Sequence, residues 1–251
     1  MHKNHSQYSL RRRFFARFKN TFLQLPWLWS RIINDDSFQA QYSTKLRRLF
    51  MKVVWFWPRL IDAEQWRDAA IGNQRDPSHF VEMTPGATAL VDAVTSTTPD
   101  MSAPILDLGC NSGRILNALR EKGYSNLHGV DISQAAYEHM HKVFPELAQQ
   151  VHYTVATFQK YLTEQPEKSI ETIFSHGATV ELVHPSFPLI KHLCRVSKTY
   201  VILYFYETEH SYPRFWEWEF NREGYYLCEA RRPAGPNAPN SLLVFKRSDR
   251  E

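Results

Sequence analysis

The chain is poor in cysteine, and its few cysteines exclude two kinds of cysteine-dependent protein. The three among 251 residues, Cys110, Cys194 and Cys228, are odd in number and far apart. They form neither a disulfide framework nor the paired spacing of a structural metal site, so we expect no bound metal. A reducing compartment is the simpler expectation, and we predict a cytoplasmic location.

Long apolar runs are missing as well. Near the start of the chain the longest run, Val53–Trp57, has five residues and stands between Lys52 and Pro58. A membrane-spanning helix needs about 20 such residues, and the apolar part of a secretory signal needs about 7 to 15. We therefore expect neither a span nor a cleaved signal. With 43% hydrophobic and 22% charged residues, the sequence predicts a soluble protein with one sizeable core, or a core with an appendage.

Acidic residues are nearly absent from the first quarter of the chain. Residues 1–61 hold 12 Lys or Arg but only Asp35 and Asp36, a net charge of +10, whereas the remainder has a net charge of −6. In "LRRRFFARFKNTFLQL" and "KLRRLFMKVVWFW", apolar residues recur every three or four positions, which predicts two amphipathic helices. The sequence thus predicts a basic, aromatic, helical region over residues 1–65 and a globular domain over residues 66–251.

Four roles for the basic region stay open. Lys and Arg attract anionic lipid headgroups while Phe and Trp enter the headgroup boundary, so residues 10–60 are suited to a membrane surface. The same charges suit the phosphates of a nucleic acid. An Arg-rich start without acidic residues also resembles an organellar import peptide. Finally, the apolar helix faces can pack on the rest of the chain or on a second copy. We favour a protein peripheral to the membrane.

Strands and helices alternate in the second part of the chain. This alternation predicts a mainly parallel sheet that is covered by helices on both faces. Two final segments, "YYLCEARRP" and "NSLLVFKR", flank the turn-rich "AGPNAPN" and predict an antiparallel pair at a sheet edge. The predicted strands are 105–108, 127–131, 151–155, 172–175 and 200–206, and the predicted helices are 114–121, 134–143 and 188–196.

The most informative stretch is "ILDLGCNSGRILNAL", residues 105–119, where a strand meets a helix across two glycines. Gly109 and Gly113 permit positive φ angles and let a ligand approach the backbone closely. The free N–H groups at the start of the helix suit an anionic group. Arg114 opens that helix, and we expect it to be a solvated residue rather than the partner of a carboxylate.

A second acidic residue follows one βα unit later. Asp131 in "GVDIS" ends the second predicted strand, 18 positions after Gly113. A carboxylate in that position can accept hydrogen bonds from both hydroxyls of a ribose. Together with the glycine loop, Asp131 predicts a nucleoside-containing ligand at the carboxyl ends of the strands.

The spacing of the glycines distinguishes among nucleoside-binding families. Dinucleotide-binding proteins use Gly-x-Gly-x-x-Gly, whereas this chain has Gly-Cys-Asn-Ser-Gly with Asp107 two residues upstream. The pattern resembles the first motif of the class I S-adenosylmethionine (SAM)-dependent methyltransferases, acidic–apolar–Gly–x–Gly–x–Gly, with Asn111 in place of the middle glycine. From Ile105 to the carboxyl end, the resemblance implies an α/β fold with a doubly wound, mainly parallel, seven-stranded Rossmann-like sheet whose final strand is reversed. It also implies SAM as cofactor and methyl transfer as the reaction, with the basic region as an N-terminal helical extension.

The resemblance implies roles for the residues that follow the first two strands. The glycine loop is expected to pack against the methionine part of SAM, and Asp107 to hydrogen-bond near its ammonium group. Asp131 is expected to hold the ribose hydroxyls. The implied cofactor-binding residues of this part are Asp107, Gly109, Cys110, Asn111, Gly113, Asp131 and Ile132.

Residues after the third and fourth strands complete the implied site. By register, the resemblance implies that Thr157 meets the adenine amino group and that Phe158 meets the adenine ring. Many relatives carry an acidic residue at the position of Thr157. The resemblance also implies that Ser175 belongs to the cofactor site and that His176 and Gly177 line its mouth.

Three residues are candidates for a catalytic base. Methyl transfer from a sulfonium is an in-line displacement, for which alignment of donor and acceptor supplies most of the rate. An oxygen or nitrogen acceptor can still need a base, and His176, Glu181 and His184 follow the fourth strand, where a base would stand. Two of them have structural alternatives, Glu181 as a solvated charge and His184 as a turn residue before Pro185.

One class of acceptor is disfavoured by what the chain lacks after the fourth strand. Methyltransferases that act on adenine N6 or on glutamine amides usually carry Asn/Asp-Pro-Pro-aromatic there, whereas this chain has Ser175-His176-Gly177-Ala178. By elimination we predict a small-molecule, glycan or lipid-linked acceptor. Two alternatives stay open: an RNA methyltransferase that grips its substrate with the basic region, and a non-catalytic adaptor at a membrane surface whose cofactor site has decayed at Asn111 and Thr157.

Overall fold

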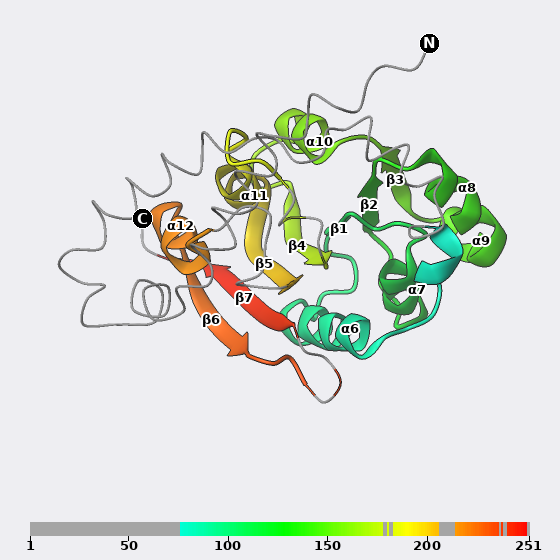
Figure 1. Cartoon of the computed structure of the whole chain (residues 1–251), viewed down its shortest axis with the longest axis horizontal. Coiled ribbons are helices and arrows are strands. Elements are labelled where there is room, and N and C mark those ends of the chain that lie inside the picture. The colour runs from blue at the N-terminus through cyan, green and yellow to red at the C-terminus, as the bar shows by residue number, and fades with distance from the viewer. Residues whose placement is uncertain are drawn as a thin grey trace, which may run out of the picture.

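The computed structural model in Figure 1 describes residues 76–177, 180, 183–205, 214–235, 237 and 240–249. The predicted basic region, residues 1–65, and the candidate base Glu181 lie outside the described residues. Among the helices inside these ranges, none combines the length and the apolar character that a membrane crossing requires.

Seven strands form one sheet in the order β3-β2-β1-β4-β5-β7-β6. Neighbouring strands from β3 to β5 are parallel, whereas β7 runs antiparallel to both β5 and β6. The predicted mainly parallel sheet, its reversed final strand and the antiparallel pair at its edge are therefore confirmed. The strands are β1 Ile105–Leu108, β2 Leu127–Asp131, β3 His152–Val155, β4 Ile170–His176, β5 Ser197–Phe205, β6 Tyr225–Arg231 and β7 Ser241–Arg247.

Helices link the parallel strands and lie on both faces of the sheet (Figure 1). Two of them, α7 and α8, have the bounds that the sequence predicts. The described helices are η1 Pro77–Phe80, α6 Pro85–Thr97, α7 Arg114–Glu121, α8 Gln134–Val143, α9 Pro145–Ala148, α10 Phe158–Glu164, α11 Leu189–Val196 and α12 Trp216–Arg222.

The core is divided in two because alternate residues of each central strand point to opposite faces. On one face, Leu106 and Ile173 pack with apolar residues of α10, α11 and α12. On the other face, Ile105 and Phe174 pack with residues of α6, α7, α8 and α9. Both faces of the central strands are therefore buried, which is why these strands are almost continuously apolar.

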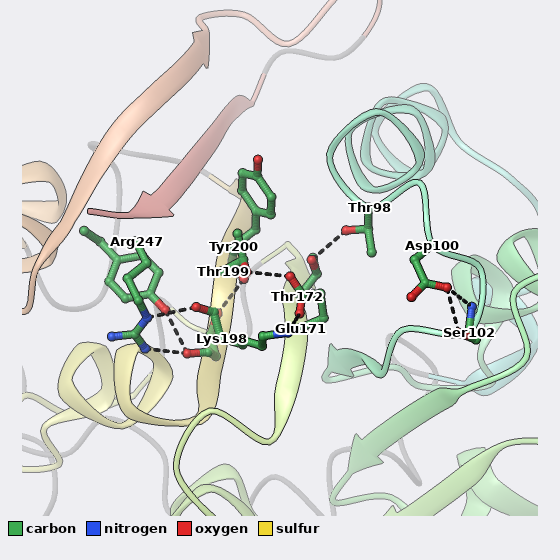
Figure 2. A network of polar contacts seen from close by, with 11 residues as sticks. Thr98, Asp100, Ser102, Glu171, Thr172, Lys198, Thr199, Tyr200 and Arg247 are labelled. Carbon is green, nitrogen blue, oxygen red and sulfur yellow. Dashed lines mark hydrogen bonds and ion pairs between the residues drawn. The ribbon is translucent and has the colours of Figure 1, made fainter. Parts of the chain in front are cut away.

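The amino ends of β4 and β5 were predicted two and three residues too late, and the residues added there are mostly polar. These residues form the network in Figure 2. Glu171 accepts a 2.5 Å hydrogen bond from the Thr199 hydroxyl, and its other oxygen lies 3.1 Å from Lys198 Nζ. Beside it, the buried hydroxyls of Thr172 and Thr98 share a 2.6 Å hydrogen bond that joins β4 to the end of α6. The network fixes the end of the sheet opposite to the glycine loop.

Removal of one member of the threonine pair tests how much this network contributes to the free energy of unfolding. Thr172→Val leaves the buried Thr98 hydroxyl without a partner, so we expect the free energy of unfolding to fall by about 1–3 kcal/mol. The double variant Thr98→Val/Thr172→Val removes both polar groups and is expected to recover most of that loss. Urea denaturation followed by circular dichroism measures both. A single variant as stable as wild type, or a double variant that is less stable than the single one, would contradict this assignment.

Candidate functional site

The predicted site residues meet where the strand order reverses. β1 has β2 on one side and β4 on the other, so connections run in opposite directions from it. In open α/β sheets, ligands bind at the carboxyl ends of the strands at such a point. The loop after β1, Asp131 at the end of β2 and His176 at the end of β4 all lie at this edge.

Three residues of the loop after β1 have positive φ angles. The values are 88° for Gly109, 47° for Asn111 and 83° for Gly113. Asparagine tolerates the left-handed region better than most residues. In addition, the Asn111 side-chain oxygen accepts a 2.7 Å hydrogen bond from the Ser112 N–H. Asn111 therefore meets the conformational demand at the position where the family motif has a glycine.

Gly113 also allows α7 to begin close to a neighbouring helix. A Cβ atom at this position would lie 2.8 Å from Leu147 Cδ2 of α9, in addition to the strain of its φ angle. Gly113 precedes the first residue of α7, and no side chain caps this helix. The first N–H groups of α7 thus remain available at the site.

Asp131 ties the tip of β2 to the glycine loop. Its Oδ2 accepts from the Asn111 N–H and its Oδ1 from the Ser133 N–H, both at 2.9 Å. Burial raises the pKa of Asp131, and the backbone N–H groups of Ser133, Asn111 and Ile132 oppose that increase. A carboxylate has about four lone-pair positions, so these contacts leave room for hydrogen bonds from ribose hydroxyls.

Asp107 carries the least compensated charge of the site. Its side chain is buried, and its Oδ1 has no hydrogen-bond partner in the part of the chain that the structure describes. Burial, and then the charge of Asp131, raise the pKa of Asp107 well above its usual value, while the cationic Arg114 opposes the increase. A buried carboxylate oxygen without a partner calls for a cationic N–H donor, and the ammonium group of SAM is such a donor. The residues present therefore fit the implied cofactor.

The prediction that Arg114 is solvated was wrong. The residue is buried, its Nη1 donates to the Glu82 carbonyl at 3.0 Å, and its Nη2 lies 3.4 Å from His176 Nδ1. The guanidinium also lies 5.9 Å from the centre of the Phe80 ring. The field of a helix disfavours a cation at the first position, and this mismatch was the sequence signal for a residue with another task.

Of the two candidate bases among the described residues, His176 lies at the edge of the site next to Arg114. It pairs in register with Tyr204 of β5, and their rings stack with centroids 4.9 Å apart. Its Nε2 is buried without a hydrogen-bond partner among the described residues. Burial and the charge of Arg114 lower the pKa of His176 to about 4, so the ring is neutral at pH 7. The sequence analysis had no signal for Tyr204, whose role depends on strand register.

The segment before α6 covers the glycine loop and Arg114. The Ser112 hydroxyl lies 3.5 Å from the Pro77 carbonyl and 3.1 Å from His139 Nδ1 of α8. Phe80 and Glu82 of the same segment contact Arg114, as described above. Residues 77–82 therefore contact the glycine loop, through Ser112, and Arg114 at the start of α7.

The two residues predicted to meet the adenine follow β3. Thr157 caps α10, and its hydroxyl oxygen accepts a 3.2 Å hydrogen bond from the Lys160 N–H. Phe158 is partly buried and packs against the core on the α10–α12 face. The hydroxyl of Thr157 keeps a second lone pair, which could accept a hydrogen bond from the adenine amino group. Both adenine contacts remain predictions.

Three other predicted residues have contacts within the protein. Cys110 is buried in the core cluster that packs on α6, α7, α8 and α9, and burial raises the pKa of its thiol well above the usual value. Ser175 is buried and donates a 2.7 Å hydrogen bond to the Leu108 carbonyl, which joins β4 to β1. His184 Nδ1 accepts from the Ser186 N–H at 3.1 Å, in the turn that the sequence analysis gave as its alternative role.

Comparisons with known proteins agree with this geometry. Residues 105–199 match the family model described as a methyltransferase domain. This range contains the glycine loop, Asp131 and His176. None of the curated protein sequences that were compared with the chain matches it.

Solved structures share the fold. The magnesium protoporphyrin IX methyltransferase from Synechocystis, crystallised with SAM, has a TM-score of 0.59 at 17% identity over 75% of this chain and 98% of that chain. A TehB-like SAM-dependent methyltransferase from Corynebacterium glutamicum has a TM-score of 0.52 at 18% identity over 74% and 96%. The [4+2]-cyclase SpnF has a TM-score of 0.51 at 13% identity over 63% and 80%.

At these identities the solved structures show the fold, and the family model matches the region 105–199. The matched domain has the glycine loop and the two aspartates in the places that the family motif requires. The match over residues 105–199 and the shared fold therefore support a SAM-dependent methyltransferase.

Proposed function

We propose that the chain transfers the methyl group of SAM to an oxygen or nitrogen atom of a small-molecule, glycan or lipid-linked acceptor. The observation that carries this proposal is His176 Nε2, a buried polar atom at the end of β4 that has no hydrogen-bond partner among the described residues. The net charge of −6 outside residues 1–61 supports an acceptor other than a nucleic acid. The Synechocystis relative is named for a porphyrin, which is a small molecule.

Two carboxylates and the glycine loop are the groups that would hold SAM. Asp107 would accept from the ammonium group through its unpartnered Oδ1, and Asp131 would accept from the ribose hydroxyls. The N–H groups of the loop and of the start of α7 suit the carboxylate end. When bound, SAM supplies a methyl group that is already activated on a sulfonium. The protein's own contribution is then to align the acceptor and exclude water.

The alternative of a non-catalytic adaptor depended on Asn111 and Thr157. Asn111 adopts the positive φ angle that the loop demands, and its N–H is bonded to Asp131. Thr157 caps α10 through a hydroxyl that can still accept a second hydrogen bond. Neither residue therefore supplies a physical reason for a decayed site.

Titration calorimetry with S-adenosylhomocysteine tests the cofactor site. Asp131→Ala removes the acceptor for the ribose and for the Asn111 N–H, so we expect its affinity to fall at least tenfold, which is about 1.4 kcal/mol. Asp92→Ala on the exposed face of α6 is the control and should bind as wild type does. Folded wild-type protein that does not bind, or an Asp131→Ala variant with wild-type affinity, would contradict the proposal.

We also propose that the protein is cytoplasmic and peripheral to an anionic membrane surface. The support comes from the sequence, in the net charge of +10 over residues 1–61 and in the aromatic residues at helical spacing among the basic ones. The acidic remainder of the chain would be held away from the same surface.

Vesicle co-sedimentation of the full chain tests this location. Each basic residue near an anionic surface contributes about 1 kcal/mol. The triple variant Arg11→Ser/Arg12→Ser/Arg13→Ser is therefore expected to bind phosphatidylserine vesicles about a hundredfold more weakly than wild type. Phosphatidylcholine vesicles are the control. Equal binding to both vesicle types, or salt-sensitive binding to RNA with none to vesicles, would overturn the proposal.

A further inference from the structure

Arg114 is a buried cation that has no ion-pair partner within 4 Å in the described part of the chain. Its hydrogen bonds go to a neutral backbone carbonyl, that of Glu82, and to an imidazole nitrogen, His176 Nδ1. The third contact is the face of Phe80. Asp107 acts on the charge of Arg114 but forms no ion pair with it, so the guanidinium still has N–H donors that an anionic ligand could use.

The contact with Arg114 determines which nitrogen of His176 carries the proton. A guanidinium has five N–H donors and no acceptor, so the Nδ1 atom that lies 3.4 Å from Arg114 Nη2 has to accept. A neutral imidazole has one N–H group, which is then on Nε2. The ring is neutral at pH 7 because burial and the charge of Arg114 lower the pKa of His176 to about 4. His176 therefore offers one N–H donor, at Nε2.

That donor is buried and lacks an acceptor among the described residues. The ring is held in place by stacking on Tyr204, at 23° between the planes, and by the register of β4 and β5. Tyr204 is in turn fixed against Gly86, where a Cβ would lie 2.3 Å from its ring. A buried N–H group without an acceptor costs about 1–3 kcal/mol, and an oxygen atom of a ligand would recover that cost.

We propose that Arg114 is a positioning residue that holds His176 in its Nε2–H form, and that the pair selects a methyl acceptor that is already an oxyanion, namely a carboxylate. This inference rests on the proposed function and specifies its substrate class, a carboxylate as the methyl acceptor. His176 is then an acceptor-binding donor and not a general base. Its Nε2 already carries a proton, and its Nδ1 faces a cation.

The chemistry of the transfer agrees with such a pair. An alcohol or an ammonium group has to lose a proton before or during methylation, and this pair has no free position to take one. A carboxylate is ionised at neutral pH, since its ordinary pKa is about 4. One of its oxygens forms the new C–O bond while the C–S bond breaks and its electron pair stays on sulfur. The other oxygen can accept from His176 Nε2–H, and no proton leaves.

Nitrogen-15 NMR of the full chain, labelled in histidine and saturated with S-adenosylhomocysteine, tests the first half of this inference. We expect His176 to show the Nε2–H tautomer at pH 7, with its signals assigned by their loss in His176→Gln. Arg114→Lys keeps a donor and should keep the tautomer, whereas Arg114→Met should give a mixture. Arg120→Met on the same helix is the control and should change nothing. An Nδ1–H tautomer or a charged ring in the wild type would overturn the inference.

Addition of small ions to the same sample tests the second half. We expect acetate to shift the His176 Nε2–H signal in a saturable way and methylammonium to leave it unchanged. The apparent affinity for acetate should fall at least tenfold in Arg114→Met, whose fold is checked by circular dichroism. No response to acetate, or an equal response to methylammonium, would overturn the carboxylate assignment. Because the cofactor analogue already fills its site, failure of S-adenosylhomocysteine to bind would instead count against the proposed function.

Discussion

The site depends on one buried carboxylate, Asp107, at the end of the central strand β1. Its burial and the nearby Asp131 raise its pKa, and one of its oxygens has no partner among the described residues. Its contribution to the free energy of unfolding is therefore fully present below the unfolded pKa of about 3.9 and is lost as the pH rises through the higher folded pKa. A bound ammonium group would offset this cost, which is why we propose that Asp107 accepts a hydrogen bond from the ammonium group of the cofactor.

The rest of the site is arranged around that carboxylate by backbone geometry. Positive φ angles at Gly109, Asn111 and Gly113 turn the chain sharply enough for α7 to begin beside the end of β1. The turn directs the Asn111 N–H to Asp131. It also places Arg114 within hydrogen-bond distance of His176 and near enough to Asp107 for its charge to oppose the increase in the pKa of that carboxyl group. The fold alone does not fix the reaction, since a cyclase shares it. We propose that the side chains at the ends of β1, β2 and β4 determine the reaction.

Much of this could be predicted from the sequence because the signals were local. Strand and helix periods, the two glycines and the distance to Asp131 predicted the sheet and the cofactor edge. What could not be predicted depends on contacts between distant segments. Arg114 was taken for a surface residue because only the packing of residues 80–82 and His176 makes it buried, and Tyr204 became relevant only through its register with β4. The polar starts of β4 and β5 were missed because their partners lie across the sheet.

The central claim is that the unpartnered Asp107 receives the cofactor's ammonium group. Calorimetric titration of S-adenosylhomocysteine at mildly acidic pH, in two buffers with different enthalpies of ionisation, measures the protons exchanged on binding. Because Asp107 has a raised pKa in the free protein, binding of a cation should lower that pKa and release protons. The release should disappear in Asp107→Asn, together with most of the affinity. Binding without proton release, or an Asp107→Asn variant that binds with unchanged affinity and unchanged proton release, would contradict the account.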